Sequence, residues 1–181
     1  MTSRREQLEA VAALFTYPRT DWAKAVENVL ACSGSAAPAL LEFAREIRCM
    51  PLSGLQELYT STFDLYPVCT LDLGWHLFGE DHKRGLLLAR MRRELRAHGI
   101  PETRELPDHL SHALLLLARM APAQGEEFAS VIVAPAVVRM LKCMPSSNRF
   151  TCLLRAVRQL ITLHFPAAFE PVSPVAEGAM L

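Results

Sequence analysis

Apolar residues recur at intervals of three and four positions along most of the chain, which is the spacing of one face of an α-helix. Strand-like alternation of Val, Ile and Thr is nearly absent. The pattern predicts an all-α protein, a single-domain bundle of about eight or nine helices over residues 1–166. Beyond Pro166 the periodicity fades and further prolines follow, so residues 167–181 are predicted to form an extended or disordered tail.

Turn and capping signals locate the helices in the middle of the chain. The clearest predicted helix covers about residues 82–98, with Asp81 placed to cap its start and Gly79 suited to the left-handed turn before it. The run 108–120 is apolar on most sides, which is typical of a central, buried helix, and Pro107 fits its first turn. The sequence therefore predicts two helices joined by a polar turn.

Other helix boundaries are marked locally. Ser3 and Glu6 have the spacing of a capping box, and Ser53 is expected to cap a helix that begins there. Pro135 lies inside a helix predicted between about 126 and 142. We expect it to kink that helix, because proline lacks the amide hydrogen of an intrahelical hydrogen bond.

The overall composition excludes several classes of protein. The chain of 181 residues has 19 Lys and Arg against 19 Asp and Glu, and this balance removes the attraction that dominates non-specific nucleic-acid binding. No apolar run approaches the roughly 20 residues that span a bilayer, so no stable membrane insertion is expected. The five cysteines form no CxxC pair and follow no secretion signal, which favours a cytoplasmic protein with small buried thiols.

Charge is distributed unevenly within this neutral total. Between Arg48 and Lys83 the sequence holds five carboxylates and no Lys or Arg, whereas residues 82–98 hold six basic residues and one acidic residue. The acidic stretch contains the aromatic residues Tyr59, Phe63, Tyr66, Trp75 and Phe78. A groove with an aromatic floor and an acidic rim, suited to a cationic and partly apolar peptide, would have this composition. Aromatic residues that fill the core, beside acidic residues that cap helices or pair with the basic helix, would have it too, and the pattern alone favours this second interpretation.

No signature of a common catalytic site occurs in the sequence. The phosphate-binding loop, the dinucleotide-binding glycines, the nucleophile elbow and the zinc motif HExxH are all absent. His109 and His112 could share a helical face, but two imidazoles without a further ligand at helical spacing do not make a tetrahedral metal site. We therefore predict no catalytic residue, no metal site and no cofactor. An enzyme of another type, using His109, Asp108 and a cysteine, is the alternative.

Three short motifs follow one another in the middle of the chain. They are YTSTFDL at Tyr59–Leu65, WHLFGEDHKRG at Trp75–Gly85 and ELPDHL at Glu105–Leu110. In this order they resemble the respiratory nitrate reductase assembly chaperones, the delta-subunit or NarJ-like branch of the helical molybdoenzyme chaperones that also include the TorD and DmsD types. The resemblance is clear over about residues 55–120.

The resemblance implies a cytoplasmic, all-helical chaperone that is not an enzyme. Such proteins bind the N-terminal leader of an immature molybdoenzyme catalytic subunit and hold it for molybdenum cofactor insertion and membrane docking. Contact with the machinery that inserts the cofactor is left open. For this chain, the implied client is a catalytic subunit like that of nitrate reductase.

The peptide-recognition role of the family transfers to the ELPDHL turn, and more loosely to the two motifs before it. Carboxylates of the acidic stretch are expected to meet the basic residues of the leader. The predicted peptide-binding residues are Tyr59, Phe63, Asp64, Asp72, Trp75, Gly79, Glu105, Pro107, Asp108 and His109. Two alternatives remain: a chaperone that proofreads the twin-arginine signal of another molybdoenzyme, or a helical adaptor or homodimer without a peptide groove.

Overall fold

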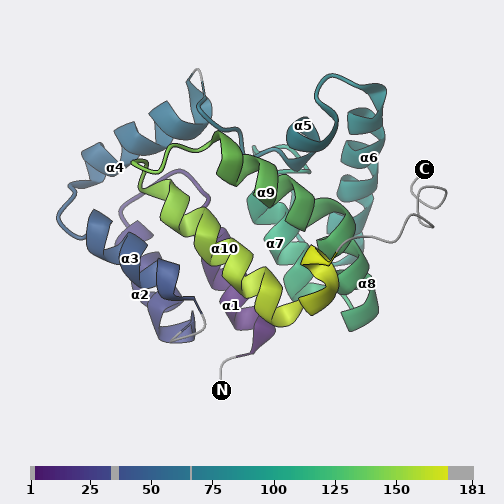
Figure 1. Cartoon of the computed structure of the whole chain (residues 1–181), viewed down its shortest axis with the longest axis horizontal. Coiled ribbons are helices and arrows are strands. Elements are labelled where there is room, and N and C mark those ends of the chain that lie inside the picture. Colours follow the sequence, from purple (N-terminus) through teal and green to yellow (C-terminus); the bar gives the residue numbers. More distant parts are fainter. Residues whose placement is uncertain (1–2, 34–36, 66, 171–181) are drawn as a thin grey trace.

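Helices make up all the regular secondary structure in the part of the chain that the computed structural model describes, residues 3–33, 37–65 and 67–170. The only β-type pairing in these ranges is an isolated bridge between Asp72 and His109. The α-helices are α1 (Arg4–Ala13), α2 (Trp22–Ser33), α3 (Pro38–Ile47), α4 (Leu52–Tyr59), α5 (Leu73–Phe78), α6 (His82–Ala97), α7 (Leu110–Arg119), α8 (Pro122–Phe128), α9 (Ala134–Cys143) and α10 (Phe150–His164) (Figure 1). The prediction of an all-α protein is confirmed.

The core lies around α10, which packs against α3, α9 and α1 (Figure 1). Behind it, α1 packs along α7, whose side chains Leu110, Leu114 and Leu117 have no exposed surface. A helix that is apolar on most sides is buried on most sides, so the prediction of a central helix after residue 108 is confirmed. At the other end of the molecule, α5 packs between α6 and α9.

Several predicted helix ends are confirmed. The Ser3 side chain accepts a hydrogen bond from the amide of Glu6 and the Glu6 side chain reaches back, as a capping box requires. Asp81 caps α6 by accepting from the amide of Lys83. Gly79 ends α5 with φ of 60°, a conformation in which a side chain would be strained.

Other predicted ends are wrong. Helix α4 begins at Leu52, so Ser53 is already inside it and does not cap it. Pro107 precedes α7 instead of lying in its first turn, because the chain turns helical only at Leu110. The N-cap of α7 is His109, whose side chain accepts from the amide of Ser111.

The irregularity expected at Pro135 takes the form of a π-helical stretch. The helical run begins at Pro122, passes through the π-helical segment η3 (Ala129–Val133) and continues as α9. Pro135 lies directly after η3, so the irregular backbone adjoins the residue that has no amide hydrogen to donate. A second π-helical segment, η2 (Thr60–Asp64), extends α4.

The C-terminal end of the described chain is the 3-10 helix η4 (Pro166–Phe169), in which Ala168 is buried. The first residues of the predicted tail are therefore packed on the bundle, and residues 171–181 lie outside the described residues, as does Tyr66. None of the described helices combines the length and apolarity needed to cross a membrane.

All five cysteines are free thiols. Cys69 and Cys152 are buried, as expected, but Cys49 and Cys143 are exposed, so the expectation that all five are buried is wrong. Each exposed cysteine lies at or just beyond the end of a helix, where the apolar face no longer continues.

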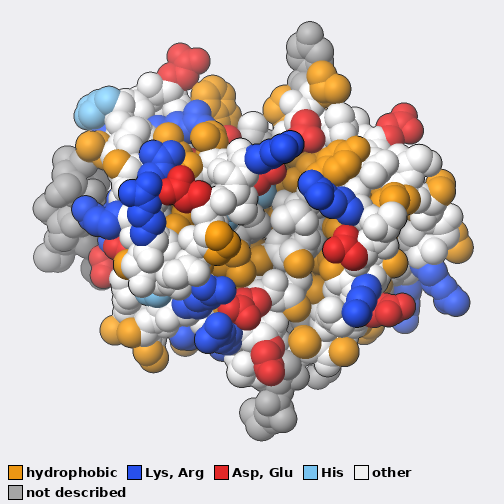
Figure 2. All heavy atoms as spheres, turned by 180° about the vertical axis from the view of Figure 1, so that it is seen from behind, with side chains coloured by type: hydrophobic (Ala, Val, Ile, Leu, Met, Phe, Trp, Pro, Cys, Tyr) orange, Lys and Arg blue, Asp and Glu red, His pale blue; other side chains and the backbone are white. Residues whose placement is uncertain are grey.

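The basic helix expected from the sequence is α6, and its charges lie on the outside of the molecule. On the face shown in Figure 2, Lys and Arg side chains gather over this helix. Part of the charge is neutralised locally, because Arg92 and Arg96 both pair with Glu102 and Arg84 pairs with Asp72. The expected pairing of acidic residues with the basic helix is therefore present.

Candidate functional site

The short helix α5 carries one of the two aromatic residues that are more than 40% exposed in the described chain, and the other is Tyr17 on the loop after α1. Trp75 on α5 is 41% exposed, and Val68, in the loop before the helix, is 45% exposed. Burial of such side chains against a partner removes apolar surface from water, so exposed apolar residues that lie together mark interaction sites. The surface around Trp75 is therefore the first candidate for a functional site.

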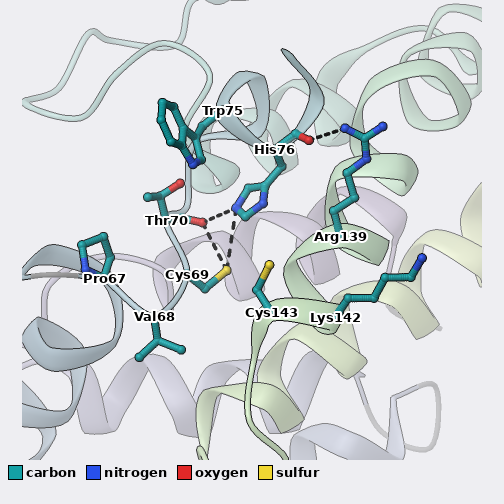
Figure 3. A pocket seen from close by; sticks show the side chains of 9 residues that line it. All are labelled: Pro67, Val68, Cys69, Thr70, Trp75, His76, Arg139, Lys142 and Cys143. Carbon is teal, nitrogen blue, oxygen red and sulfur yellow. Dashed lines mark hydrogen bonds between the residues drawn. The ribbon is translucent and has the colours of Figure 1, made fainter. Parts of the chain in front are cut away.

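Trp75 and Val68 line an open hollow of about 550 Å³ (Figure 3). One wall comes from residues 67–70 and α5, and the opposite wall comes from the C-terminal half of α9. The lining residues are Pro67, Val68, Cys69, Thr70, Trp75, His76, Arg139, Lys142 and Cys143. The hollow thus combines apolar side chains, two thiols and two cationic side chains, and no Asp or Glu lines it.

Hydrogen bonds to the end of α5 fix the two walls relative to each other. Nη1 of Arg139 donates to the carbonyl oxygens of His76 and Leu77, which a helix C-terminus leaves without partners (Figure 3). On the other wall, Nε2 of His76 lies 2.8 Å from the carbonyl oxygen of Thr70 and 3.7 Å from Sγ of Cys69. Burial lowers the pKa of His76, which favours a neutral ring that donates from Nε2 to Thr70.

The beginning of α5 is held by the ELPDHL turn. Gly74 donates its amide hydrogen to Oδ2 of Asp108 at 2.8 Å, and the amide of Leu73 donates to the Asp108 carbonyl oxygen at 2.9 Å. In return, the amide of Leu110 donates to the carbonyl oxygen of Leu71 at 2.8 Å. The carboxylate of Asp108 thus caps the N-terminus of α5. Because Asp108 is fully buried, it cannot contact a partner at the surface.

Arg84 of α6 completes this support. Its Nη2 donates to Oδ2 of Asp72 at 3.2 Å, and its Nε lies 4.0 Å from Oδ2 of Asp108. The guanidinium carbon lies 5.5 Å from the centroid of the Trp75 ring, within cation–π distance. Burial raises the pKa of Asp72 to about 6 and also raises that of Asp108, while the charge of Arg84 opposes both shifts. We call Gly74, Arg84, Asp72 and Asp108 the polar support of α5.

Gly74 is required in the polar support by lack of space. A Cβ atom at this position would lie 2.6 Å from Oδ2 of Asp108 and 3.1 Å from Cγ of Arg84. Both distances are shorter than normal packing allows. The close approach of α5 to the buried carboxylate therefore depends on a glycine, which sequence reasoning did not single out.

The two neighbouring histidines have structural roles. His109 is buried, and the hydroxyl of Ser111 lies 2.7 Å from its Nδ1, so Nδ1 is the acceptor that caps α7. Nε2 then carries the hydrogen and lies 4.0 Å from a carboxylate oxygen of Glu105. Burial lowers the pKa of His109 to about 3, with a smaller contribution from His112. His112 uses its two nitrogens on the Leu106 carbonyl and the Thr103 hydroxyl.

Tyr59 and Phe63 lie in the core, so the expectation that they form the aromatic floor of an open groove is wrong. Both rings pack against Phe150, with centroid distances of 5.8 and 4.9 Å. The hydroxyl of Tyr59 donates to the carbonyl oxygen of Phe15 at 3.1 Å. Because η2 follows α4 directly, both rings face α10, and the core interpretation holds for them.

The ten predicted residues thus separate into three groups. Tyr59, Phe63 and Pro107 are buried in the body of the protein. Asp72, Gly79, Asp108 and His109 hold α5 and the ends of its neighbours in place. Asp64, Trp75 and Glu105 are exposed and available to a partner.

Sequence reasoning also missed part of the site. Arg84 lies inside the second motif and was counted only as a charge of the basic helix. Arg139 and Lys142 belong to α9, far along the chain from the motifs, and no local signal connects them to Trp75.

Comparisons with known proteins identify the family of this chain. The model of the family described as nitrate reductase delta subunit matches residues 30–144, which include α5, α6, the ELPDHL turn and α9. The nitrate reductase molybdenum cofactor assembly chaperone NarJ of Escherichia coli K12 is 30% identical over 125 residues, covering 68% of this chain and 47% of that protein. NarJ of Escherichia coli O157:H7 matches equally, so the chain spans about half the length of these relatives.

A solved structure among those that match shares the fold. A redox enzyme maturation protein from Archaeoglobus fulgidus superposes with a TM-score of 0.65 over 89% of this chain and 95% of that chain. The sequence identity is 22%, so this likeness concerns the helical architecture alone.

Proposed function

The chain belongs to the nitrate reductase delta subunit family, and from this membership we propose that it is an assembly chaperone for a nitrate reductase. In this role it binds the N-terminal leader of the immature catalytic subunit in the cytoplasm and holds it for molybdenum cofactor insertion and membrane docking. The relatives are named as assembly chaperones and not as enzymes, in agreement with the prediction that this chain catalyses no reaction.

The observation that carries the proposal is the exposed indole of Trp75 beside an open hollow. When a partner covers an exposed tryptophan, the free energy of the system falls, because apolar surface is removed from water. The polar support beneath α5 holds this indole in place before any partner arrives. Preformed surfaces of this kind lose little conformational entropy on binding.

Carboxylates near α5 provide selectivity for a basic leader. Asp64 and Glu105 are exposed, and the charges of both add to burial in raising the pKa of the buried Tyr59, so both lie within electrostatic range of that residue. Glu105 also contributes to the raised pKa of Asp72. Exposed ion pairs contribute only about 0–1 kcal/mol each, so apolar contact with Trp75 supplies most of the affinity.

Calorimetry with a synthetic leader peptide of the nitrate reductase catalytic subunit from the same organism tests the proposal. Trp75→Ala is expected to weaken binding about 10-fold, as loss of an aromatic anchor does. The matched control is Leu163→Ala, because Leu163 is 54% exposed on α10 and lies outside the hollow. Absence of binding by the unaltered chain, or equal affinities of the two variants, would contradict the proposal.

Fluorescence supplies a second readout. The chain has two tryptophans, and Trp22 is buried, so the variant Trp22→Phe leaves Trp75 as the only indole. Bound leader is expected to protect this indole from acrylamide quenching. Unchanged quenching on saturation with the peptide would place the leader elsewhere.

A further inference from the structure

The hollow beside Trp75 differs in charge from the rest of the surface around α5. Its two cationic residues, Arg139 and Lys142, are three positions apart on α9 and therefore lie on the same side of that helix. Among the residues that the structure describes, no Asp or Glu lines the hollow, and none of the ion pairs includes either cation. Positive charge is therefore concentrated there without a counter-charge.

Arg84, which contacts the Trp75 ring but does not line the hollow, provides the contrast. Its charge is balanced by Asp72 and by the buried Asp108. The exposed carboxylate of Glu105 acts on the same cluster, since it contributes to the raised pKa of Asp72. Trp75 contacts Arg84 of this acidic cluster, and it also lines the hollow. It therefore adjoins both a region with excess carboxylates and a region with excess cations.

The shape of the hollow suits a side chain more than a flat contact. Its volume of about 550 Å³ is within the range of small-ligand sites, and Pro67, Val68 and Trp75 form an apolar wall. Arg139 is held in place by the two α5 carbonyls, so its guanidinium is already oriented. Beside apolar groups, a hydrogen bond between such a cation and a carboxylate is stronger than in open water.

We propose that this hollow binds an acidic side chain of the client segment that crosses Trp75, and so fixes the direction in which that segment lies. The inference rests on the proposed function and specifies the chemistry of the bound segment. Basic residues of the segment lie toward Glu105, an apolar residue covers Trp75, and an Asp or Glu reaches Arg139 and Lys142. A segment bound in the reverse direction would bring like charges together at both ends.

Calorimetry with charge variants tests the proposal. Lys142→Glu is expected to weaken binding of the leader peptide about 10-fold, because a charge-assisted hydrogen bond is replaced by repulsion. Lys24→Glu is the matched control, since Lys24 is exposed on α2, outside the hollow, and the change in net charge is the same. Its affinity is expected to stay within about twofold of the unaltered chain at physiological ionic strength, where distant charges are screened.

Peptide variants identify the partner group. Each Asp and Glu of the leader peptide is changed in turn to its amide, and one change is expected to weaken binding to the unaltered chain while having no further effect on Lys142→Glu. Replacing that acidic residue by Lys is expected to restore binding to Lys142→Glu. These results together would establish the contact and the direction of the segment.

Other outcomes would overturn the inference. If Trp75→Ala weakens leader binding but Lys142→Glu and Lys24→Glu do not differ, the hollow holds no acidic side chain, although the proposed function stands. If pyrophosphate binds to the unaltered chain, is lost in Lys142→Glu and does not compete with the leader, the hollow is a site for a small anion. If the unaltered chain binds no leader, the proposed function fails and this inference fails with it.

Discussion

The core around α10 is buried and the polar support beneath α5 is buried or half-buried, but the two regions are held by different forces. In the core, residues such as Phe43, Phe150 and Leu114 have no exposed surface and pack by shape and volume. In the polar support, two carboxylates, a guanidinium and one glycine depend on hydrogen-bond direction and on distances between single atoms. Apolar packing is non-directional and tolerates exchange of similar volumes, whereas a buried polar cluster requires every partner.

This difference explains why a recognition motif can lie largely inside the protein. Asp108 and His109 belong to the turn that resembles the peptide-recognition motif, yet both are buried. They determine where α5 lies, and α5 presents Trp75 to the surface. Changes in the core should therefore affect stability alone, while changes in the polar support should affect stability and binding together.

The largest expected effect is in the core. Leu114→Ala removes a fully buried side chain from α7 and should lower the free energy of unfolding by about 2–5 kcal/mol, because burial is lost and a cavity remains. Urea denaturation measures the loss. Leader affinity at low temperature, where the variant is still folded, should equal that of the unaltered chain, and a weaker affinity would break the separation between the two regions.

A smaller effect on stability, with an effect on binding, is expected in the polar support. Gly74→Ala places a methyl group 2.6 Å from Oδ2 of Asp108 and should cost about 1–3 kcal/mol of unfolding free energy. Because α5 must shift to relieve the contact, leader affinity should fall as well. Gly85→Ala on α6 is the control, since its Cβ meets nothing within 4 Å and helix propensity should make it slightly more stable. Equal behaviour of the two variants would contradict the role given to Gly74.

The smallest expected effect is confined to acid. The pKa of His109 is lowered to about 3 in the folded chain, so between pH 7.5 and 5.5 only the unfolded chain takes up its proton, with an ordinary pKa of about 6.5. This group should therefore lower the free energy of unfolding by about 1.4 kcal/mol as the pH falls over that interval. The raised pKa of Asp72 acts in the opposite direction and is present in every variant compared.

Urea titrations at the two pH values measure the contribution. His109→Gln should lose this contribution. Between pH 7.5 and pH 5.5, its free energy of unfolding should therefore fall less, or rise more, than that of the unaltered chain. A pH profile of His109→Gln identical to that of the unaltered chain would mean that His109 is not held neutral in the fold.

Much of the fold could be predicted from local signals in the sequence. The apolar run after residue 108 predicted a buried helix, and Gly79 and Asp81 marked the boundary between α5 and α6. These predictions succeed because helical periodicity, caps and left-handed turns involve residues within one or two turns of each other. The one-residue displacement at Ser53 is an error of boundary only.

The site was less predictable because its geometry joins distant parts of the chain. Composition could not distinguish an aromatic floor from an aromatic core, and only the packing of Phe63 against Phe150 decides between them. The cationic wall depends on Arg139 reaching the carbonyl of His76, 63 positions earlier in the sequence. No pattern within a single helix carries information about such a contact.

The hydrogen bond between Gly74 and Asp108 also affects how rigidly α5 is held. Helix α5 has only six residues, which is too short to persist in water without tertiary contacts. Its first turn is anchored to the residue pair that starts α7, the most deeply embedded helix of the molecule. Trp75 is therefore held on a rigid base that is anchored in the buried centre of the protein, and a partner that binds there must do most of the conformational adjustment.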